Sequence, residues 1–209
     1  MMMSLSKVVL ASNNPGKLKE FSAILGAAGI EMVAQNTLGV SEAEEPYLTF
    51  VENALAKARH ASRITGLPAL ADDSGLCVPA LNNAPGVFSA RYAAMHGGEK
   101  SDTANNHHLL SMLANHSDRS AYYVAVLVYL RFADDPCPVI AQGLWHGEIA
   151  KQPAGQHGFG YDPYFYLPNL GQTAAQLEPE LKNAYSHRGR ALKTLLGMLQ
   201  TASPVPHVD

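Results

Sequence analysis

The sequence contains few cysteines and no excess of basic residues. Only two of its 209 residues are cysteines, Cys77 and Cys137, and they match no zinc-ligand spacing. A single pair in a chain of this length argues against a secreted, disulfide-stabilised protein. The formal net charge is -3, so no basic surplus would draw the chain onto DNA or RNA. We therefore expect reduced thiols and no polymeric nucleic acid as a partner.

Long apolar segments are also missing. The longest apolar run, Tyr122 to Leu130, is far shorter than the roughly 20 residues that a helix needs to cross a bilayer. The first residues, Met1 to Lys7, contain no charged segment followed by a long apolar run, so we expect no signal peptide. These absences predict no contact with a membrane and a location in the cytoplasm.

What is present is enough apolar sequence for a core and a pattern that mixes helices with strands. Hydrophobic residues make up 47% of the chain, and the length predicts a single domain over residues 1–209. Early strands alternate with helices, whereas two later strands, about 119–133 and 138–149, form a predicted hairpin. This mixture favours an α/β fold with a mixed sheet. The other predicted elements are strands at 7–11, 30–33, 69–71 and 164–167 and helices from Pro15 to Gly29, from Thr49 to Gly66, from a cap at Asp102 to about Asn115, at Thr173 to Glu178 and from about Ser186 to Gln200.

Polar segments that contain glycine interrupt this pattern at four places: Ser12–Lys17, Ala71–Gly75, Phe159–Pro163 and Ser186–Gly189. Segments of this composition usually hold ligands rather than pack in a core. Because they are far apart in the chain, they predict one site assembled from distant parts. Their carboxylates, lysine and arginine suit a ligand that carries phosphate, together with a metal ion.

The first polar segment precedes a predicted helix and ends at Lys17. Backbone N–H groups at a helix N-terminus attract phosphate, and a lysine adds positive charge. Leu18 follows where a Walker A loop needs Ser or Thr, which argues against a P-loop NTPase. An ordinary helix cap explains the Ser and Asn residues of this segment equally well.

Two acidic pairs, Glu44-Glu45 and Asp72-Asp73, are candidates for a cation site. Adjacent carboxylates are unfavourable to bury without a cation, and Mg²⁺ typically uses one or two carboxylates together with substrate phosphates. The alternative is that both pairs are solvent-exposed. Taken singly, Lys57 and Lys182 are likewise expected at the surface, because charged side chains are mostly exposed.

Five motifs together resemble the inosine triphosphate pyrophosphatase family, also called the non-canonical purine NTP or dITP/XTP pyrophosphatases. Each motif is modest alone, but the five occur in order and at compatible spacing over about residues 7–200. They are S-x-N-x-G-K at Ser12–Lys17, T-F-x-E-N-A-x-x-K-A at Thr49–Ala58, A-D-D-S-G-L at Ala71–Leu76, F-G-Y-D-P at Phe159–Pro163 and S-H-R-G-x-A-L at Ser186–Leu192.

The resemblance implies Mg²⁺-dependent hydrolysis of ITP, dITP and XTP to the monophosphate plus pyrophosphate, which keeps deaminated purines out of DNA and RNA. It also implies a homodimer and an elongated, two-lobed α/β fold of the ITPase-like or Maf-like kind. In that fold helices flank a mixed sheet and the active-site cleft lies between the lobes.

The resemblance also implies a role for individual residues. Asp73 would be the general base and, with Glu44, would hold Mg²⁺, with Glu45 and Asp72 close by. On physical grounds, donors from Lys182, His187 or Arg188 would face the C6 oxygen of the base, which adenine lacks. The residues that would bind the substrate are Ser12, Asn13, Asn14, Pro15, Gly16, Lys17, Lys57, Ser74, Phe159, Gly160, Tyr161, Asp162, Lys182, His187 and Arg188.

The sequence departs from the usual motifs of this family at two places, and two other functions are alternatives to the purine pyrophosphatase. Ser12 stands where many relatives have Thr, and Gln156-His157 replaces the usual small residues before Gly158. A pyrophosphatase that acts on modified pyrimidine or canonical nucleotides, as the Maf-like proteins do, is the runner-up. A nucleotide-binding protein without activity is a third reading, although it would be expected to lack one of the four carboxylates.

Overall fold

The computed structural model describes residues 7–201, so the expectations for residues 1–6 and for the remaining C-terminal residues lie outside the described part. One sheet of eight strands forms the centre of the molecule. Its strands are β1 (Val8–Leu10), β2 (Met32–Ala34), β3 (Ala69–Val78), β4 (Ala84–Pro85), β5 (Ser120–Leu130), β6 (Val139–Ile149), β7 (Phe165–Leu167) and β8 (Gln172–Thr173).

The sheet is mixed, as predicted. Its strand order is β2-β1-β3-β5-β6-β7-β8, and β4 pairs with β3 beside this path. The β1–β2 and β1–β3 pairs are parallel, whereas β3 and all later neighbours pair antiparallel. The long β5–β6 hairpin, in register from Ser120 opposite Glu148 to Tyr129 opposite Val139, confirms the two long strands expected from the sequence.

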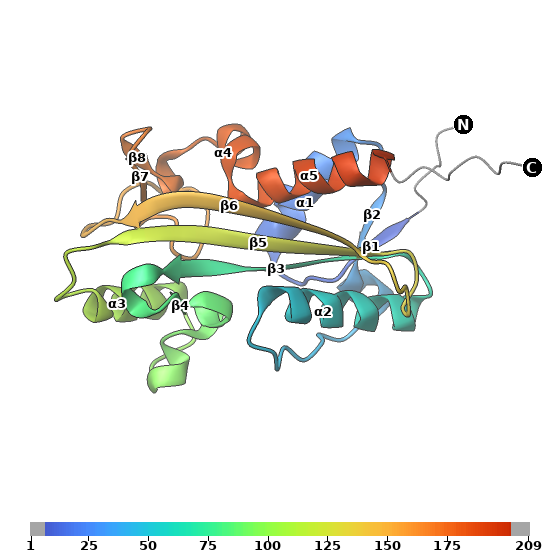
Figure 1. The fold of residues 1–209 in the computed structure, drawn as a ribbon, viewed down its shortest axis with the longest axis horizontal. Coiled ribbons are helices and arrows are strands. Elements are labelled where there is room, and N and C mark those ends of the chain that lie inside the picture. The colour runs from blue at the N-terminus through green and yellow to red at the C-terminus, as the bar shows by residue number, and fades with distance from the viewer. Residues whose placement is uncertain (1–6, 202–209) are drawn as a thin grey trace, which may run out of the picture.

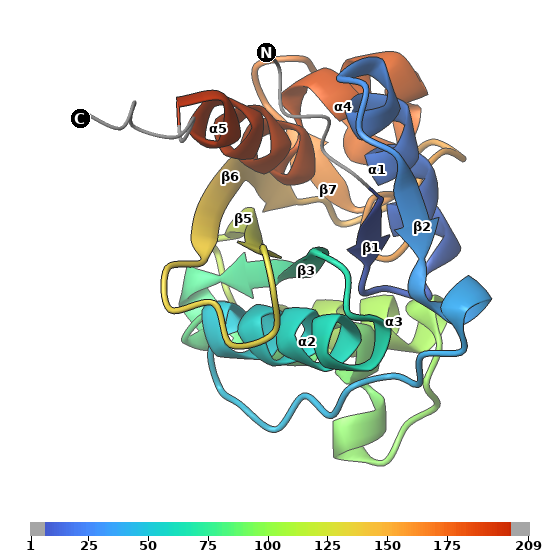
Figure 2. The ribbon, with the colours of Figure 1, turned by 90° about the vertical axis from the view of Figure 1, so that its right-hand side faces the viewer.

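The five α-helices of the described residues cover the two faces of the sheet (Figures 1 and 2). One face carries α1, α4 and α5, and the other carries α2 and α3. None of the described helices is long and apolar enough to cross a membrane. The helices are α1 (Pro15–Ala27), α2 (Phe50–Thr65), α3 (Asp102–Met112), α4 (Pro179–Tyr185) and α5 (His187–Thr201).

The two helical layers bury apolar stripes that the sequence pattern predicts. Phe21 and Leu25 of α1 and Leu195 of α5 pack on one face of the sheet. The alanines of α2, among them Ala54 and Ala58, pack on the other face, where small side chains let the helix approach closely. A third cluster, around Trp145 and Phe165, packs between α3 and the strands β5, β6 and β7.

Three expectations about local structure were wrong. The sequence suggested a loop after Ala71, but β3 continues through Asp72 and Asp73 to Val78. Ion pairs to both carboxylates make this burial possible. The segment Thr173–Glu178 is a strand end and a 3₁₀ turn instead of an α-helix. The cap of α3 is Ser101, whose side chain accepts from Ala104 N, and Asp102 is the first helical residue.

Candidate active site

A cavity of about 830 Å³ opens where the four polar segments meet. The turn before α1, the middle of β3, the 159–162 loop and the start of α5 all contribute to its wall. The predicted residues that line it are Ser12, Asn13, Asn14, Lys17, Glu44, Glu45, Lys57, Ser74, Phe159, Gly160, Tyr161, Asp162, His187 and Arg188. Pro15, Gly16, Asp72, Asp73 and Lys182 lie next to these residues in the chain or in ion pairs with them.

The first polar segment is arranged by local hydrogen bonds at the start of α1. The Asn14 side chain caps the helix by accepting from Lys17 N at 3.1 Å, and Pro15 occupies the first turn. Ser12 Oγ accepts from Asn14 N at 3.2 Å. The Lys17 ammonium contacts Asp72 Oδ2 at 2.7 Å, so its charge points toward β3.

One end of the cavity is acidic. Asp73 Oδ1 accepts from Lys57 Nζ at 2.9 Å, and the same ammonium lies 2.7 Å from Glu45 Oε1. Glu44 is exposed beside them. Asp73 Oδ2 is buried without a hydrogen-bond partner in the described structure. Burial raises the pKa of Asp73 above its ordinary value, although Lys57 opposes the shift.

Asp72 differs from its neighbour because its charge is compensated. Its carboxylate contacts Lys17, and Arg188 Nε lies 3.4 Å from the same Oδ2. Burial alone would raise the pKa of Asp72, but the charges of Lys17 and Arg188 outweigh it and hold the pKa well below its usual range. Asp72 is therefore an ionised anchor for two cations.

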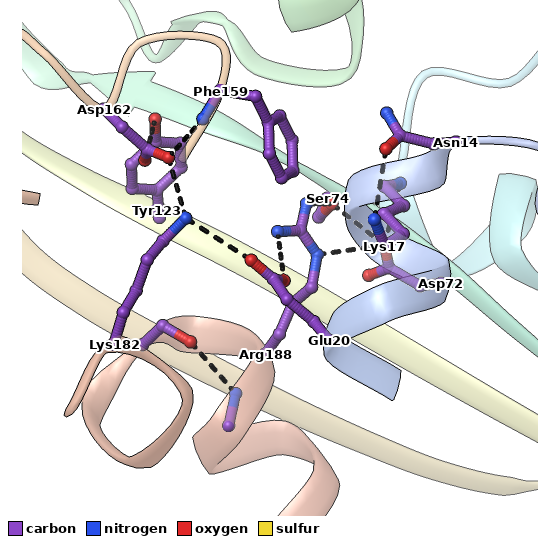
Figure 3. Close-up of polar contacts among 12 residues, drawn as sticks. Asn14, Lys17, Glu20, Asp72, Ser74, Tyr123, Phe159, Asp162, Lys182 and Arg188 are labelled. Atoms are coloured by element: carbon purple, nitrogen blue, oxygen red, sulfur yellow. Dashed lines mark hydrogen bonds and ion pairs between the residues drawn. The ribbon is translucent and has the colours of Figure 1, made fainter. Parts of the chain in front are cut away.

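The other end of the cavity combines rings with buried charges (Figure 3). Asp162 accepts from Lys182 Nζ at 2.7 Å, from Phe159 N at 2.9 Å and from the Tyr123 hydroxyl at 3.3 Å. The Phe159 ring lies 5.1 Å from Lys182 Nζ and 5.2 Å from Arg188 Cζ, which are cation–π distances. This end of the cavity therefore holds a flat aromatic ring, Phe159, with two hydrogen-bond donors, Lys182 and Arg188, close to it.

His187 belongs to the same end. Its ring stacks on Tyr123, with centroids 4.6 Å apart and planes 9° from parallel. Both ring nitrogens are buried without a hydrogen-bond partner within residues 7–201. Burial, and then the charge of Arg188, lower the pKa of His187 well below its ordinary value, so the imidazole is neutral near pH 7.

Glycines allow the close approaches on which this arrangement depends. A Cβ on Gly16 would lie 2.6 Å from the Phe159 ring, so the ring rests directly on the start of α1. A Cβ on Gly143 of β6 would lie 2.0 Å from His187 O, so α5 begins directly against the sheet. A side chain at Gly16 would displace the Phe159 ring, and one at Gly143 would displace the start of α5.

Several residues of the site were missed in the sequence, among them four that hold or face its ring-lined end. Asp102 Oδ2 accepts from Gly160 N at 2.8 Å, and Asn106 Nδ2 donates to Gly160 O at 2.9 Å, so α3 holds the 159–162 loop. Tyr123 faces the cavity from the middle of a strand whose pattern reads as core. Glu20 contacts two of the cations, and its only signal is the spacing of three residues from Lys17 on α1.

A mixed α/β fold with a cavity that is acidic at one end and lined by rings and cations at the other defines a protein built to bind a polar, ring-bearing ligand. The chain belongs to the Ham1 family, which it matches over residues 8–198. This confirms the family resemblance of the five motifs.

Relatives and solved structures agree with this assignment. The chain is 66% identical over 202 residues to the dITP/XTP pyrophosphatase of Bordetella pertussis, with 97% of this chain and 95% of that protein covered. It is 65% identical to the dITP/XTP pyrophosphatase of Burkholderia pseudomallei, with 93% of each covered. A HAM1 protein structure from Coxiella burnetii superimposes with a TM-score of 0.86 at 49% identity, covering 94% of this chain and 99% of that one.

Proposed function

We propose that this protein is a hydrolase that splits ITP, dITP and XTP into the nucleoside monophosphate and pyrophosphate. The observation that carries the proposal is the cavity itself, which combines carboxylates, a helix N-terminus and a ring face with hydrogen-bond donors. The identities of 65–66% to two proteins named dITP/XTP pyrophosphatase support the same activity. Such an enzyme would keep deaminated purines out of DNA and RNA.

The triphosphate is proposed to lie along the start of α1. The helix N-terminus attracts phosphate, and Lys17 and Lys57, which both line the cavity, supply positive charge. Lys57 now bridges Asp73 and Glu45, so it is placed to stabilise the charge that develops on the departing pyrophosphate.

The acidic end fits a divalent cation. Asp73 presents one carboxylate oxygen without a hydrogen-bond partner in the described structure, and Glu44 is exposed on the same cavity. These two residues would hold Mg²⁺, with Glu45 and Asp72 close by, although Asp72 already contacts two cations. When bound, Mg²⁺ shields the phosphate charge and makes water more acidic.

Asp73 is proposed as the general base. Its oxygen Oδ2 has two lone pairs, so beside the cation it can also accept a proton from a water molecule as the water oxygen attacks the α-phosphorus. The bond between the α-phosphorus and the bridging oxygen then breaks, and pyrophosphate leaves. Lys57 holds the other carboxylate oxygen and so fixes the orientation of the base.

The ring-lined end is proposed to select the base. A purine that stacks on Phe159 would meet Arg188, Lys182 and His187, which can donate to an oxygen at C6. Adenine carries an amino group there, so it would leave buried donors unpaired, which is strongly disfavoured. The location in the cytoplasm and the homodimer remain predictions from the composition and the family resemblance.

The test is product analysis with ITP, XTP, GTP and ATP, each with and without Mg²⁺, for the wild type and Asp73→Asn. We expect monophosphate and pyrophosphate from ITP and XTP only when Mg²⁺ is present. Removal of a general base typically lowers kcat by 10²- to 10⁴-fold, and we expect a loss of about this size.

Asp134→Asn is the matched control, because Asp134 is an exposed aspartate whose ion-pair partner within residues 7–201 is the exposed Arg63. This variant should keep wild-type kcat. Release of orthophosphate, equal use of ATP, or binding without turnover would contradict the proposed function.

A further inference from the structure

Glu20 lies between the two cations at the ring-lined end of the cavity, although it belongs to no recognised motif (Figure 3). Its Oε1 is 3.3 Å from Lys182 Nζ, and its Oε2 is 3.0 Å from Arg188 Nη1. The side chain is only 13% exposed, and its partners are buried more deeply still. Each carboxylate oxygen of Glu20 is therefore committed to a different buried cation.

The carboxylate of Glu20 completes a charge-neutral network. The three cations are Lys17, Lys182 and Arg188, and the three anions are Asp72, Asp162 and Glu20. The ion pairs join all six groups into one chain from the start of α1 to the 159–162 loop. Without Glu20 the chain breaks at its middle and leaves a net positive charge in a buried place, where unpaired charge is strongly unfavourable.

Glu20 also restricts where the remaining donors point. Lys182 has three N–H donors, of which one contacts Glu20 and one contacts Asp162, so one is left. Arg188 uses its three nitrogens on Glu20, Asp72 and Ser74. Anchors on both sides hold the two cations beside the Phe159 ring, where the donors that are left would meet a stacked base.

The position of Glu20 on α1 links the two ends of the site. Lys17 and Glu20 are three residues apart, so they lie on the same face of the helix. Lys17 faces the phosphate side through Asp72, and Glu20 faces the base side through Lys182 and Arg188. A single helical turn thus sets the distance between the two parts of the site.

We infer that Glu20 is a positioning residue for base recognition: it holds Lys182 and Arg188 in the geometry that reads the purine edge. The inference rests on the proposed function, because it concerns the base of the same substrate. Glu20 does not touch the reacting phosphorus, so its loss should weaken recognition of the base far more than it slows the chemical step.

The experiment compares steady-state kinetics of the wild type, Glu20→Gln and Glu20→Asp with ITP and ATP. For Glu20→Gln, which keeps the shape and removes the charge, we expect the KM for ITP to rise about tenfold and kcat to change less than about threefold. The preference for ITP over ATP in kcat/KM should fall about tenfold. Glu20→Asp keeps the charge on a shorter side chain, so its KM for ITP and its ITP preference should lie between those of the wild type and Glu20→Gln.

Two controls separate positioning from general damage. Glu31→Gln removes a glutamate that pairs with Lys7 on the surface, where both side chains are more than half exposed, and should behave as wild type. Inhibition by tripolyphosphate reports phosphate binding without a base. The inhibition constant of tripolyphosphate should not rise in Glu20→Gln, whereas a distorted active site would bind tripolyphosphate less tightly and raise it.

The possible outcomes are distinct. If the wild type does not hydrolyse ITP, the proposed function fails. If the wild type is active and Glu20→Gln keeps its KM for ITP and its ITP preference within twofold, the inference about Glu20 fails while the function stands. The inference would also fail if the KM for ITP, the KM for ATP and the inhibition constant of tripolyphosphate all rose by the same factor. If Glu20→Gln does not fold, Glu20→Asp decides, and unchanged ITP preference in that variant overturns the inference.

Discussion

At the scale of single residues, this protein buries charges in its interior and compensates each of them. Asp72, for example, is completely buried as a side chain, and its pKa stays well below the usual range because Lys17 and Arg188 outweigh the effect of burial. Such groups are rarely found inside proteins without partners. In the sequence these charged residues are far apart, and their pairing appears only in the folded chain.

His187 gives a prediction at this scale that depends on pH. Its pKa is lowered well below 6.5 in the folded protein, so the unfolded chain binds a proton below pH 6.5 and the folded chain does not. The free energy of unfolding should therefore fall as the pH drops below 6.5, by up to about 2 kcal/mol from this group at pH 5. His187→Phe, which keeps the ring stack on Tyr123, should remove that part of the pH dependence.

The measurement is urea unfolding at pH 7.5 and pH 5 for both proteins. The exposed His157 provides the control, since His157→Gln should keep the wild-type pH dependence. An identical loss of stability in the wild type and His187→Phe would show that other groups cause it.

At the scale of secondary-structure elements, close contacts between backbones decide where the site residues lie. The motif Ser186–Gly189 begins α5, and this helix rests on β6 at Gly143. The sequence pattern predicted both elements correctly, because the apolar stripe of the helix and the alternating strand are strong signals. It held no signal for the contact between them, because glycine in a strand has many explanations.

Gly143→Ala tests this contact. A Cβ at that position would lie 2.0 Å from the backbone oxygen of His187, so α5 must move, and overpacking of this kind destabilises proteins by about 1–3 kcal/mol. We expect a loss of stability in that range or above, together with a higher KM for ITP, because Arg188 moves with the helix. Gly26→Ala in α1, where a Cβ would meet nothing within 4 Å, should be neutral or stabilising when both variants are compared by urea unfolding.

At the scale of the whole molecule, the long strands β3, β5 and β6 connect two ends that carry different parts of the site (Figure 1). Residues 42–46 line the acidic side of the cavity, and the 159–162 loop lines the side that carries the Phe159 ring. A ligand that contacts both sides should therefore reduce the opening of both together.

Hydrogen exchange tests this arrangement. With Mg²⁺ and a non-hydrolysable ITP analogue, amide exchange should become slower both in residues 41–49 and in residues 153–163. At a concentration of 100 Kd the ligand should also raise the free energy of unfolding by about 2.7 kcal/mol. Protection confined to one side would contradict a ligand that spans the cavity, and an ATP analogue at equal concentration provides the comparison.

The sequence by itself determined the α/β class, the long hairpin and the family, because periodicity and the five motifs are local properties that need no knowledge of contacts. The tertiary structure decided that Asp72 and Asp73 lie within a strand, and that Glu20, Tyr123 and Asp102 join the site. The physical reason is that ion pairs and close packing depend on residues far apart in the chain. A carboxylate in a sequence therefore suggests an exposed loop, because the distant cation that allows its burial cannot be identified from the sequence.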